Sequence, residues 1–300
     1  MWYNGEKVNK MITTIVKPVG YCGGVTRAIE IARTVKKENP DKRINVFGML
    51  VHNYDVVNKL EEEGIHTVYV TDPIRQLNEF TKDDIVVFTS HGHPKAYSEI
   101  LEAKGITYFD AVCVRVKSNL DRIANAPGEV IYIGYADHPE TKAVLALRDK
   151  KTIALYDVHS GMDSTVITTM NPLVINQTTL SITELNKIYS AIKFKYPDAI
   201  YSDEICSATR LRQQAIMNLD EDTDLIIVVG SPKSSNTDKL FKLAKTHYPN
   251  ANVFKVDNIE QFLRYHLNLK HIKKAAIAGG ASTPIEQVEK IERYLASQNG

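Results

Sequence analysis

Residues 17–30 read "KPVGYCGGVTRAIE" and contain the first copy of the pattern that decides the fold. An apolar, strand-like run precedes this stretch, two glycines follow Cys22, and a helical pattern begins at those glycines. The start of a helix gathers backbone N–H groups and the positive end of the helix dipole, and both favour a thiolate. The position of Cys22 therefore indicates a residue placed for chemistry rather than for packing.

The two other cysteines repeat this arrangement at nearly equal intervals. Cys113 lies 91 residues after Cys22, and Cys206 lies 93 residues after Cys113. Each cysteine precedes apolar residues at the helical steps i, i+3, i+4 and i+7. These residues are Val25, Ala28, Ile29, Ala32 and Val35, then Val116, Leu120, Ile123 and Ala124, then Ala208, Leu211, Ala215 and Leu219. A fixed period of this kind predicts three similar structural units.

Two buried strands follow each predicted helix. The first strands lie in "INVFGMLVHN" (44–53), "VIYIGYADHP" (130–139) and "LIIVVGSPKSSN" (225–236). The second strands lie in "DIVVFTSHG" (84–92), "PLVINQTT" (172–179) and "KAAIAGGAS" (274–282). Nearly continuous apolar strands that alternate with helices predict parallel sheets covered on both faces.

Polar side chains stand just beyond these strands, at the edge of a parallel sheet where ligands bind. They are His52, His138 and Ser234 after the first strands, and His91, Thr178 and Ser282 after the second strands. A single histidine at a strand end is more often structural than functional, but three matched sets favour a site. We therefore expect an α/β fold of three similar domains with mostly parallel sheets, arranged pseudo-threefold around a central cavity that the cysteines and polar groups line.

The composition bounds the class of protein. The chain has 300 residues, 43% of them apolar, and a net charge of +1. Such a chain can form two or three domains, and its balanced charge predicts no nucleic-acid partner and no basic membrane surface. No apolar run is long enough to span a bilayer, and the first residues do not resemble a signal peptide. We therefore expect a cytoplasmic protein.

The odd number of cysteines argues against a disulfide framework, and the absence of a CxxC pair excludes a zinc ribbon. Three converging thiolates are typical ligands of soft metals or an iron–sulfur cluster. A four-iron cluster held by three cysteines keeps one iron open for substrate. Zinc bound by three cysteines and a histidine is the structural alternative.

The remaining polar groups suit an anion. Imidazoles, hydroxyls, an amide and helix N-termini are donors for phosphate oxygens. The candidate groups are His52, His91, His138, Ser234, Ser235, Asn236 and Ser282. The chain has neither a P-loop lysine motif nor GxGxxG, which argues against the usual nucleotide sites. Glu140, two residues after His138, is the candidate proton carrier.

Eight blocks of the sequence together resemble one family, the 4-hydroxy-3-methylbut-2-enyl diphosphate reductases (the IspH or LytB family). The blocks are "GYCGGVTRAI", "VHNYDVVNKLEEEG", "SHG", "HPE", "QTTLS", "DEICSATRLRQ", "GSPKSSNT" and "GGASTP", and the resemblance runs from about Thr14 to the C-terminus. It implies reduction of an allylic diphosphate to isopentenyl and dimethylallyl diphosphates, the last step of the non-mevalonate isoprenoid route. It also implies three α/β domains around a central iron–sulfur cluster, and reduced ferredoxin or flavodoxin as the electron donor.

The resemblance also implies domain bounds and residue roles. The predicted domains cover 24–112, 113–202 and 203–300, and the N-terminal segment 1–23 packs with the third. Cys22, Cys113 and Cys206 match the ligands of a [4Fe-4S] cluster with one open iron. His52, His91, His138, Ser234, Ser235, Asn236 and Ser282 match diphosphate-binding positions. Thr178 matches a hydroxyl near the reacting end of the substrate, and Glu140 matches the proton donor.

Two segments depart from the family pattern. The family usually has Thr-Cys-Pro at the second cysteine, where this chain has Val112-Cys113-Val114. It usually has Gly-Val where this chain has Gly92-His93.

Two other functions compete with the reductase. A family member that serves only as a cluster-bearing iron or redox sensor is the first alternative, but it would not need Glu140. A hydro-lyase with an open iron is the second, but its carboxylate substrates would call for arginines in the site.

Overall fold

The computed structural model describes residues 10–298, and these residues form two compact units. One unit is the continuous segment Gly23–Cys206. The other combines the N-terminal residues up to Cys22 with the chain from Ser207 onward. Both boundaries between the units therefore fall directly after a cysteine of the repeat.

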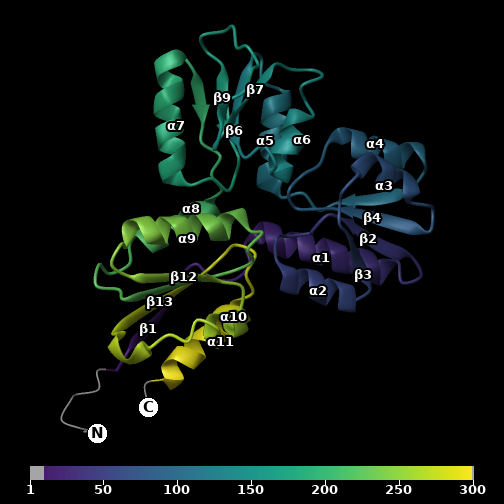
Figure 1. Cartoon of the computed structure of the whole chain (residues 1–300). Coiled ribbons are helices and arrows are strands. Elements are labelled where there is room, and N and C mark those ends of the chain that lie inside the picture. Colours follow the sequence, from purple (N-terminus) through teal and green to yellow (C-terminus); the bar gives the residue numbers. More distant parts are fainter. Residues whose placement is uncertain (1–9, 299–300) are drawn as a thin grey trace, which may run out of the picture. The chain divides into compact units, whose positions relative to one another are not determined.

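The first sheet lies in the segment Gly23–Cys206 and has the strand order β3-β2-β4-β5, all parallel. Helices α3 and α4 pack their apolar residues on one face, and α1 and α2 contact the sheet as well (Figure 1). Its elements are α1 (Gly23–Glu38), β2 (Arg43–Phe47), α2 (Tyr54–Glu62), β3 (Ile65–Val68), α3 (Pro73–Glu79), β4 (Asp84–Phe88), α4 (Lys95–Ala103) and β5 (Thr107–Asp110).

The second sheet lies in the same unit, with the order β10-β9-β6-β7-β8. Only the short β8 is antiparallel to its neighbour. Helix α7 packs on one face, and α5 and α6 pack on the other. The elements are α5 (Val114–Ala124), β6 (Val130–Gly134), α6 (Pro139–Leu145), β7 (Ile153–Asp157), β8 (Gly161–Met162), β9 (Leu173–Asn176), α7 (Ile182–Lys195) and β10 (Ile200–Ser202).

The third sheet has the order β1-β13-β11-β12 and is fully parallel. Helices α8 and α9 cover one face, and α10 and α11 cover the other (Figure 1). The elements are β1 (Ile12–Val16), α8 (Ser207–Met217), β11 (Leu225–Val229), α9 (Ser235–His247), β12 (Asn252–Val256), α10 (Ile259–Leu263), a 3-10 turn (Leu269–His271), β13 (Lys274–Gly279) and α11 (Ile285–Ser297).

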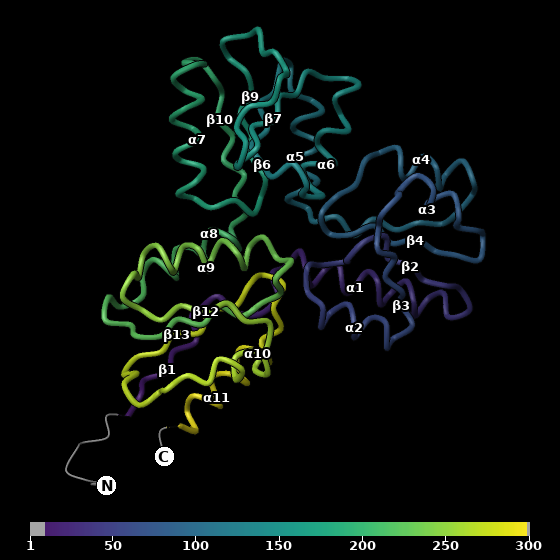
Figure 2. Tube along the Cα trace, in the orientation of Figure 1, coloured from purple at the N-terminus to yellow at the C-terminus, as the bar shows by residue number. Residues whose placement is uncertain are grey.

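Four strands of each sheet share one order, to which the second sheet adds β8. The two strands that the sequence predicts in each repeat, β2 and β4, β6 and β9, and β11 and β13, are neighbours at the centre of each sheet. The strand that leads to the next cysteine lies beside the second of these: β5 before Cys113, β10 before Cys206 and β1 before Cys22. The third sheet therefore takes this strand from the N-terminus, and the purple β1 runs beside the yellow β13 (Figure 2).

The predicted α/β class with mostly parallel sheets is confirmed. The threefold arrangement and the bounds 24–112, 113–202 and 203–300 stay predictions, and residues 1–9 of the 1–23 segment lie outside the described residues. Within residues 10–298, no helix is long and apolar enough to cross a membrane.

The apolar stripe predicted for α8 is partly wrong. Leu211 is 53% exposed, and Leu219 lies beyond the end of the helix. The helix instead buries Arg212, whose guanidinium donates to the carbonyl oxygens of Gly20 (2.7 Å) and Gly279 (3.3 Å). Buried carbonyl groups need donors, so a buried arginine takes the place that a periodicity argument gives to leucine.

Candidate active site

The three cysteines are held to their sheets in the same way. The Cys22 N–H donates to Ala281 O (2.9 Å), the Cys113 N–H to Ser90 O (3.0 Å) and the Cys206 N–H to Thr178 O (3.0 Å). Each acceptor is the second residue after a central strand, namely β13, β4 or β9. Each cysteine directly precedes a helix, carries a thiol rather than a disulfide, and is partly exposed. The sequence repeat is therefore also a repeat of backbone anchoring.

A cluster of three histidines lies at the strand ends of the Gly23–Cys206 unit. The rings of His52 and His91 stack, with centroids 3.9 Å apart and planes at 19°. The ring of His138 stands edge-on to both, with centroids 5.9 Å from His52 and 6.1 Å from His91. These residues follow β2, β4 and β6, so two different sheets bring the three imidazoles together.

Two imidazoles of the cluster, those of His91 and His138, are uncharged near neutral pH. Burial, together with the neighbouring His52 and His138, holds the pKa of His91 well below its usual range. Burial, and then His52, lowers the pKa of His138 to about 3. Three imidazolium rings this close would repel one another, whereas neutral imidazoles can each donate one hydrogen bond to an anion.

Glu140 is buried within the second sheet and its helices, with 1% of its surface exposed. Its Oε1 accepts from the Thr178 N–H (3.1 Å) and its Oε2 accepts from the Thr178 hydroxyl (2.8 Å). Asn119 on α5 donates its Nδ2 to the same carboxyl at 3.4 Å. Burial raises the pKa of Glu140 to about 7, although these donors act in the opposite direction. A carboxyl with this pKa can hold and release a proton near neutral pH.

Helix α6 places Glu140 beside the histidine cluster. His138 is the N-cap of α6, and its Nδ1 accepts from the Glu140 N–H at 3.2 Å. Pro139 occupies the first turn, where a missing N–H has no cost. One short segment, His138-Pro139-Glu140, thus fixes an imidazole and a carboxyl at the end of one strand.

The serine-rich loop after β11 lies in the unit that contains Cys22. Ser234 is the N-cap of α9, and its Oγ accepts from the Thr237 N–H at 3.3 Å. Asn236 is 4% exposed, and neither its Oδ1 nor its Nδ2 has a hydrogen-bond partner among the described residues. A buried amide without partners at the start of a 13-residue helix suits a polar ligand, because unsatisfied amides are costly. Ser235 follows the cap, and Ser282 follows β13 in the same sheet.

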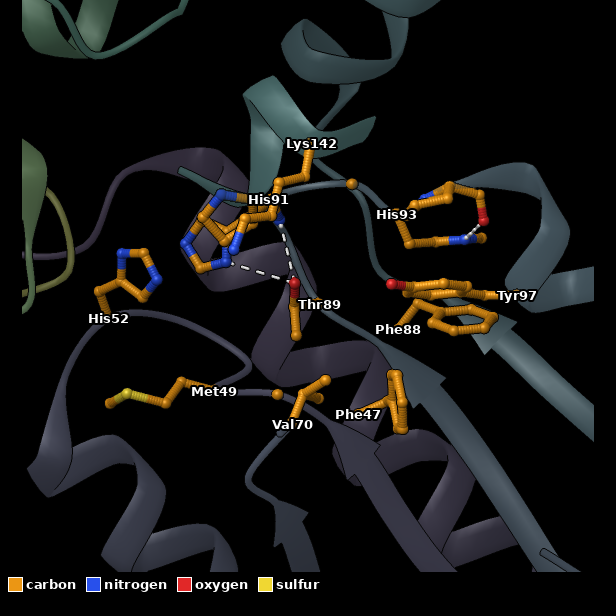
Figure 3. Close-up of a pocket in the computed structure, with 14 residues that line it drawn as sticks. Phe47, Met49, His52, Val70, Phe88, Thr89, His91, His93, Tyr97 and Lys142 are labelled. Atoms are coloured by element: carbon orange, nitrogen blue, oxygen red, sulfur yellow. Dashed lines mark hydrogen bonds between the residues drawn. The ribbon is translucent and has the colours of Figure 1, made fainter. Parts of the chain in front are cut away.

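A cavity of about 230 Å³ adjoins the histidine cluster (Figure 3). His52, His91 and Lys142 line one side. His93, stacked on Phe88 with ring centroids 3.7 Å apart, lies on the other side with Tyr97. His93, the residue that departs from the family pattern, therefore packs among aromatic rings.

Sequence reasoning overlooked the polar residues that surround Glu140. Asn119 is 1% exposed and lies between the expected apolar positions of α5, where it bonds Glu140 and the carbonyl oxygen of Asn176 (3.1 Å). Tyr132 is fully buried in β6, and its hydroxyl lowers the pKa of Glu140. Both look like packing residues in a periodicity analysis. An amide in the buried stripe of an amphipathic helix was the available signal.

Comparison with known proteins settles the family. The family model described as "LytB protein" matches residues 13–296. The chain belongs to the LytB family. Among curated LytB relatives, a protein of Bacillus velezensis is 33% identical over 285 residues, which cover 93% of this chain and 89% of the relative. A protein of Bacillus subtilis is 32% identical over the same shares. Both are named 4-hydroxy-3-methylbut-2-enyl diphosphate reductase.

Solved structures of LytB-like chains agree. The structure of the E-1-hydroxy-2-methyl-but-2-enyl-4-diphosphate reductase from Plasmodium falciparum matches with a TM-score of 0.82 and 28% identity, covering 95% of this chain and 88% of that one. A second, titled as the terminal enzyme of the non-mevalonate pathway, matches with a TM-score of 0.64 and 27% identity, covering 95% and 100%. The expected family is therefore confirmed, while the roles of individual residues stay predictions.

Proposed function

We propose that this LytB-family chain is a 4-hydroxy-3-methylbut-2-enyl diphosphate reductase, an iron–sulfur oxidoreductase of the non-mevalonate isoprenoid route. The reaction uses two electrons and two protons to remove a hydroxyl as water, and it yields isopentenyl and dimethylallyl diphosphates. The observation that carries the proposal for this chain is the pair Glu140–Thr178, a buried carboxyl with a pKa of about 7 in contact with a hydroxyl. A redox sensor would have no use for a titratable carboxyl in this position.

Cys22, Cys113 and Cys206 would hold the cluster, for which we propose a [4Fe-4S] type with one open iron. The described residues contain no preformed group of three or more His, Cys, Asp or Glu side chains for a metal ion, so the fit rests on the chemistry of the donors. Three partly exposed thiols, each at a helix start and each fixed through its own N–H, are suitable ligands for iron. When bound, the cluster supplies electrons and a Lewis-acidic iron.

The diphosphate would be bound by hydrogen-bond donors from both units. In the Gly23–Cys206 unit these are the imidazoles of His52, His91 and His138. In the other unit they are Ser234, Ser235, Asn236 and Ser282, supported by the N-terminus of α9. The unpartnered amide of Asn236 supports this role, since a phosphate oxygen would satisfy its Nδ2.

Glu140 would donate the proton on which departure of the hydroxyl depends. Its carboxyl is protonated below pH 7, and the Thr178 hydroxyl bonded to it would orient or pass on the proton. Burial of this pair keeps bulk water away from the carboxyl. Asn119 donates to Oε1, and the Thr178 hydroxyl donates to Oε2, so the acid has a defined orientation.

The test is turnover of the full-length chain, purified without oxygen and supplied with reduced methyl viologen. We expect consumption of 4-hydroxy-3-methylbut-2-enyl diphosphate and formation of both five-carbon diphosphates. Protein with a full iron–sulfur content but without turnover would contradict the proposal and favour the sensor. The physiological donor (ferredoxin or flavodoxin) and a cytoplasmic location stay predictions.

A further inference from the structure

A buried hydroxyl behind Glu140 has no part in the mechanism described above. Tyr132 is the third residue of β6, and none of its surface is exposed. Its hydroxyl has no partner of normal hydrogen-bond geometry among residues 10–298. Phenylalanine would fill the same space without burying a polar group, so the hydroxyl requires an explanation.

Tyr132 shares a small space with Thr141, the residue after Glu140 on α6. A Cβ atom added to Gly134 would lie 2.8 Å from Cε1 of Tyr132 and 2.7 Å from Oγ1 of Thr141. Only glycine leaves room there for both side chains. The Thr141 hydroxyl is also fully buried and also lacks a partner in the described part of the chain. Tyr132 packs on the face of the second sheet that α5 and α6 cover, and Glu140 lies on α6, so both unsatisfied hydroxyls lie on the side of the sheet that holds this carboxyl.

The groups shift one another's pKa values in directions that fit a chain of hydrogen bonds. Burial raises the pKa of Tyr132 well above its usual range, the charge of Glu140 raises it further, and the Thr141 hydroxyl lowers it. The Tyr132 hydroxyl in turn lowers the pKa of Glu140, against the larger effect of burial. These signs are those of a Thr141 hydroxyl that donates to the Tyr132 oxygen, and of a Tyr132 hydroxyl that donates to the Glu140 carboxyl.

We propose that Tyr132 is a positioning residue for Glu140, with Thr141 oriented to support it. The Tyr132 hydroxyl donates to the Glu140 carboxyl and stabilises its charged form, and the Thr141 hydroxyl donates to the Tyr132 oxygen. The contact closes to hydrogen-bond geometry when Glu140 is charged, because charge-assisted hydrogen bonds are shorter and stronger. A chain of two donors strengthens each bond in it. The use of Glu140 in catalysis rests on the proposed function, but its contact with Tyr132 does not.

The other groups that face Glu140 do not titrate over the pH range in which Glu140 changes its protonation. Asn119 on α5 and Thr178 after β9 do not titrate in the relevant range and stay unchanged in the experiment. His138, the N-cap of the same helix, has a pKa of about 3 and stays neutral above pH 5. A change in the protonation of Glu140 in a Tyr132 variant therefore reports on the Tyr132 hydroxyl.

The experiment is an infrared pH titration of the full-length, cluster-loaded chain, with the Glu140 band identified by its loss in Glu140→Gln. We expect Tyr132→Phe to raise the midpoint by about one pH unit, a tenfold change in proton affinity. Thr141→Val keeps the side-chain shape and should raise the midpoint by less. The double variant should equal Tyr132→Phe alone, because Thr141 acts only through Tyr132.

Tyr248→Phe is the matched control. Tyr248 is also buried, and its hydroxyl donates to the Leu219 carbonyl oxygen at 2.8 Å, in the other unit. This variant should leave the Glu140 midpoint unchanged. The basic limb of kcat/KM against pH should move upward with the infrared midpoint in Tyr132→Phe.

An unchanged midpoint in folded Tyr132→Phe would overturn the proposal, and so would additive shifts in the double variant. If Tyr132→Phe is too unstable to titrate, Thr141→Val decides, and an unchanged midpoint there would overturn the proposal. Absence of turnover at every pH would contradict the proposed function only, since the infrared titration does not depend on turnover.

Discussion

The loops after β6 and β11 occupy the same place in two sheets of the same strand order, yet they carry different chemistry. Both cap a helix with a side chain: His138 Nδ1 accepts from Glu140 N, and Ser234 Oγ accepts from Thr237 N. The first loop then presents a carboxyl with a pKa of about 7, whereas the second presents a serine and an amide. The backbone repeat thus provides equivalent positions: each loop has a candidate anion donor at its helix cap, His138 or Ser234, and of these two loops the one after β6 adds a titratable carboxyl.

Loss of any one of the three cysteines is expected to have the largest effect, and the same effect in each of the three sheets. Cys22, Cys113 and Cys206 have the same backbone anchor, so each Cys→Ser variant should lose the cluster and nearly all turnover. Iron and sulfide analysis with visible spectra of anaerobic protein measures this. Full cluster content in one variant would remove that cysteine from the ligand set and break the equivalence of the three positions. A stoichiometric zinc site would contradict the cluster itself.

Glu140→Gln tests whether proton transfer belongs to the second sheet. The variant keeps the size of the side chain but cannot deliver a proton, so turnover should fall by about 10²–10⁴-fold while cluster and substrate binding remain. Glu129→Gln is the control, because Glu129 also accepts hydrogen bonds, from Thr168 and Thr169, but lies outside the site. Near-normal turnover of Glu140→Gln, measured under steady-state conditions, would assign the proton to water or to the substrate.

Ser234 variants test whether the third sheet serves anion binding. Ser234→Asp retains a good N-cap, so the melting temperature should change little, but its charge should repel a diphosphate. Ser234→Ala and His138→Ala each remove one donor and should weaken affinity by roughly 10–100-fold. Calorimetric titration with substrate measures the affinities. Equal affinity of wild type and Ser234→Asp would place the diphosphate elsewhere.

The pH dependence of kcat/KM should be set by Glu140 of the second sheet and not by the serine-rich loop of the third. Glu140 must be protonated to act as an acid, so kcat/KM should fall as pH rises through its pKa of about 7, by about tenfold for each further unit. The same limb should persist in Ser234→Ala, because serine does not titrate. Kinetics between pH 6 and 9, with cluster content checked at each pH, provide the measurement. A profile that is flat up to pH 9 would mean that Glu140 is not the acid.

Thr178→Val should have the smallest effect of the five. It removes the hydroxyl that donates to Glu140 Oε2 but keeps the Thr178 N–H bond to Oε1. Turnover should fall by about tenfold, the effect of one hydrogen bond to a charged group. Thr179→Val, at the next residue, is the control. A loss as large as that of Glu140→Gln would make Thr178 an obligatory step in proton transfer rather than an orienting group.

The sequence predicted much of this molecule because its signals are local. Cys22, Cys113 and Cys206 at a regular period identify the repeat, and uninterrupted apolar runs identify the central strands, since strands covered on both faces need apolar side chains throughout. Apart from β1, the strand-like run before Lys17, the edge strands were not predicted. Segments such as β3 and β10 are short and partly exposed, and only pairing with a central strand determines their conformation.

The same contrast holds for the site: consecutive residues can be recognised in the sequence, whereas properties that depend on distant segments cannot. His138-Pro139-Glu140 is recognisable in the sequence because a helix cap and its first turn are consecutive residues. The pKa of Glu140 is a tertiary property, because it depends on burial and on Asn119, Tyr132 and Thr178 from three other segments. Stacking of His52 on His91 and burial of Arg212 are likewise tertiary, since the groups that meet are far apart in the chain. The sequence alone determined which groups stand at the strand ends, and only the tertiary structure decided which of them are neutral, charged or able to exchange a proton, because desolvation and partners from distant segments set those states.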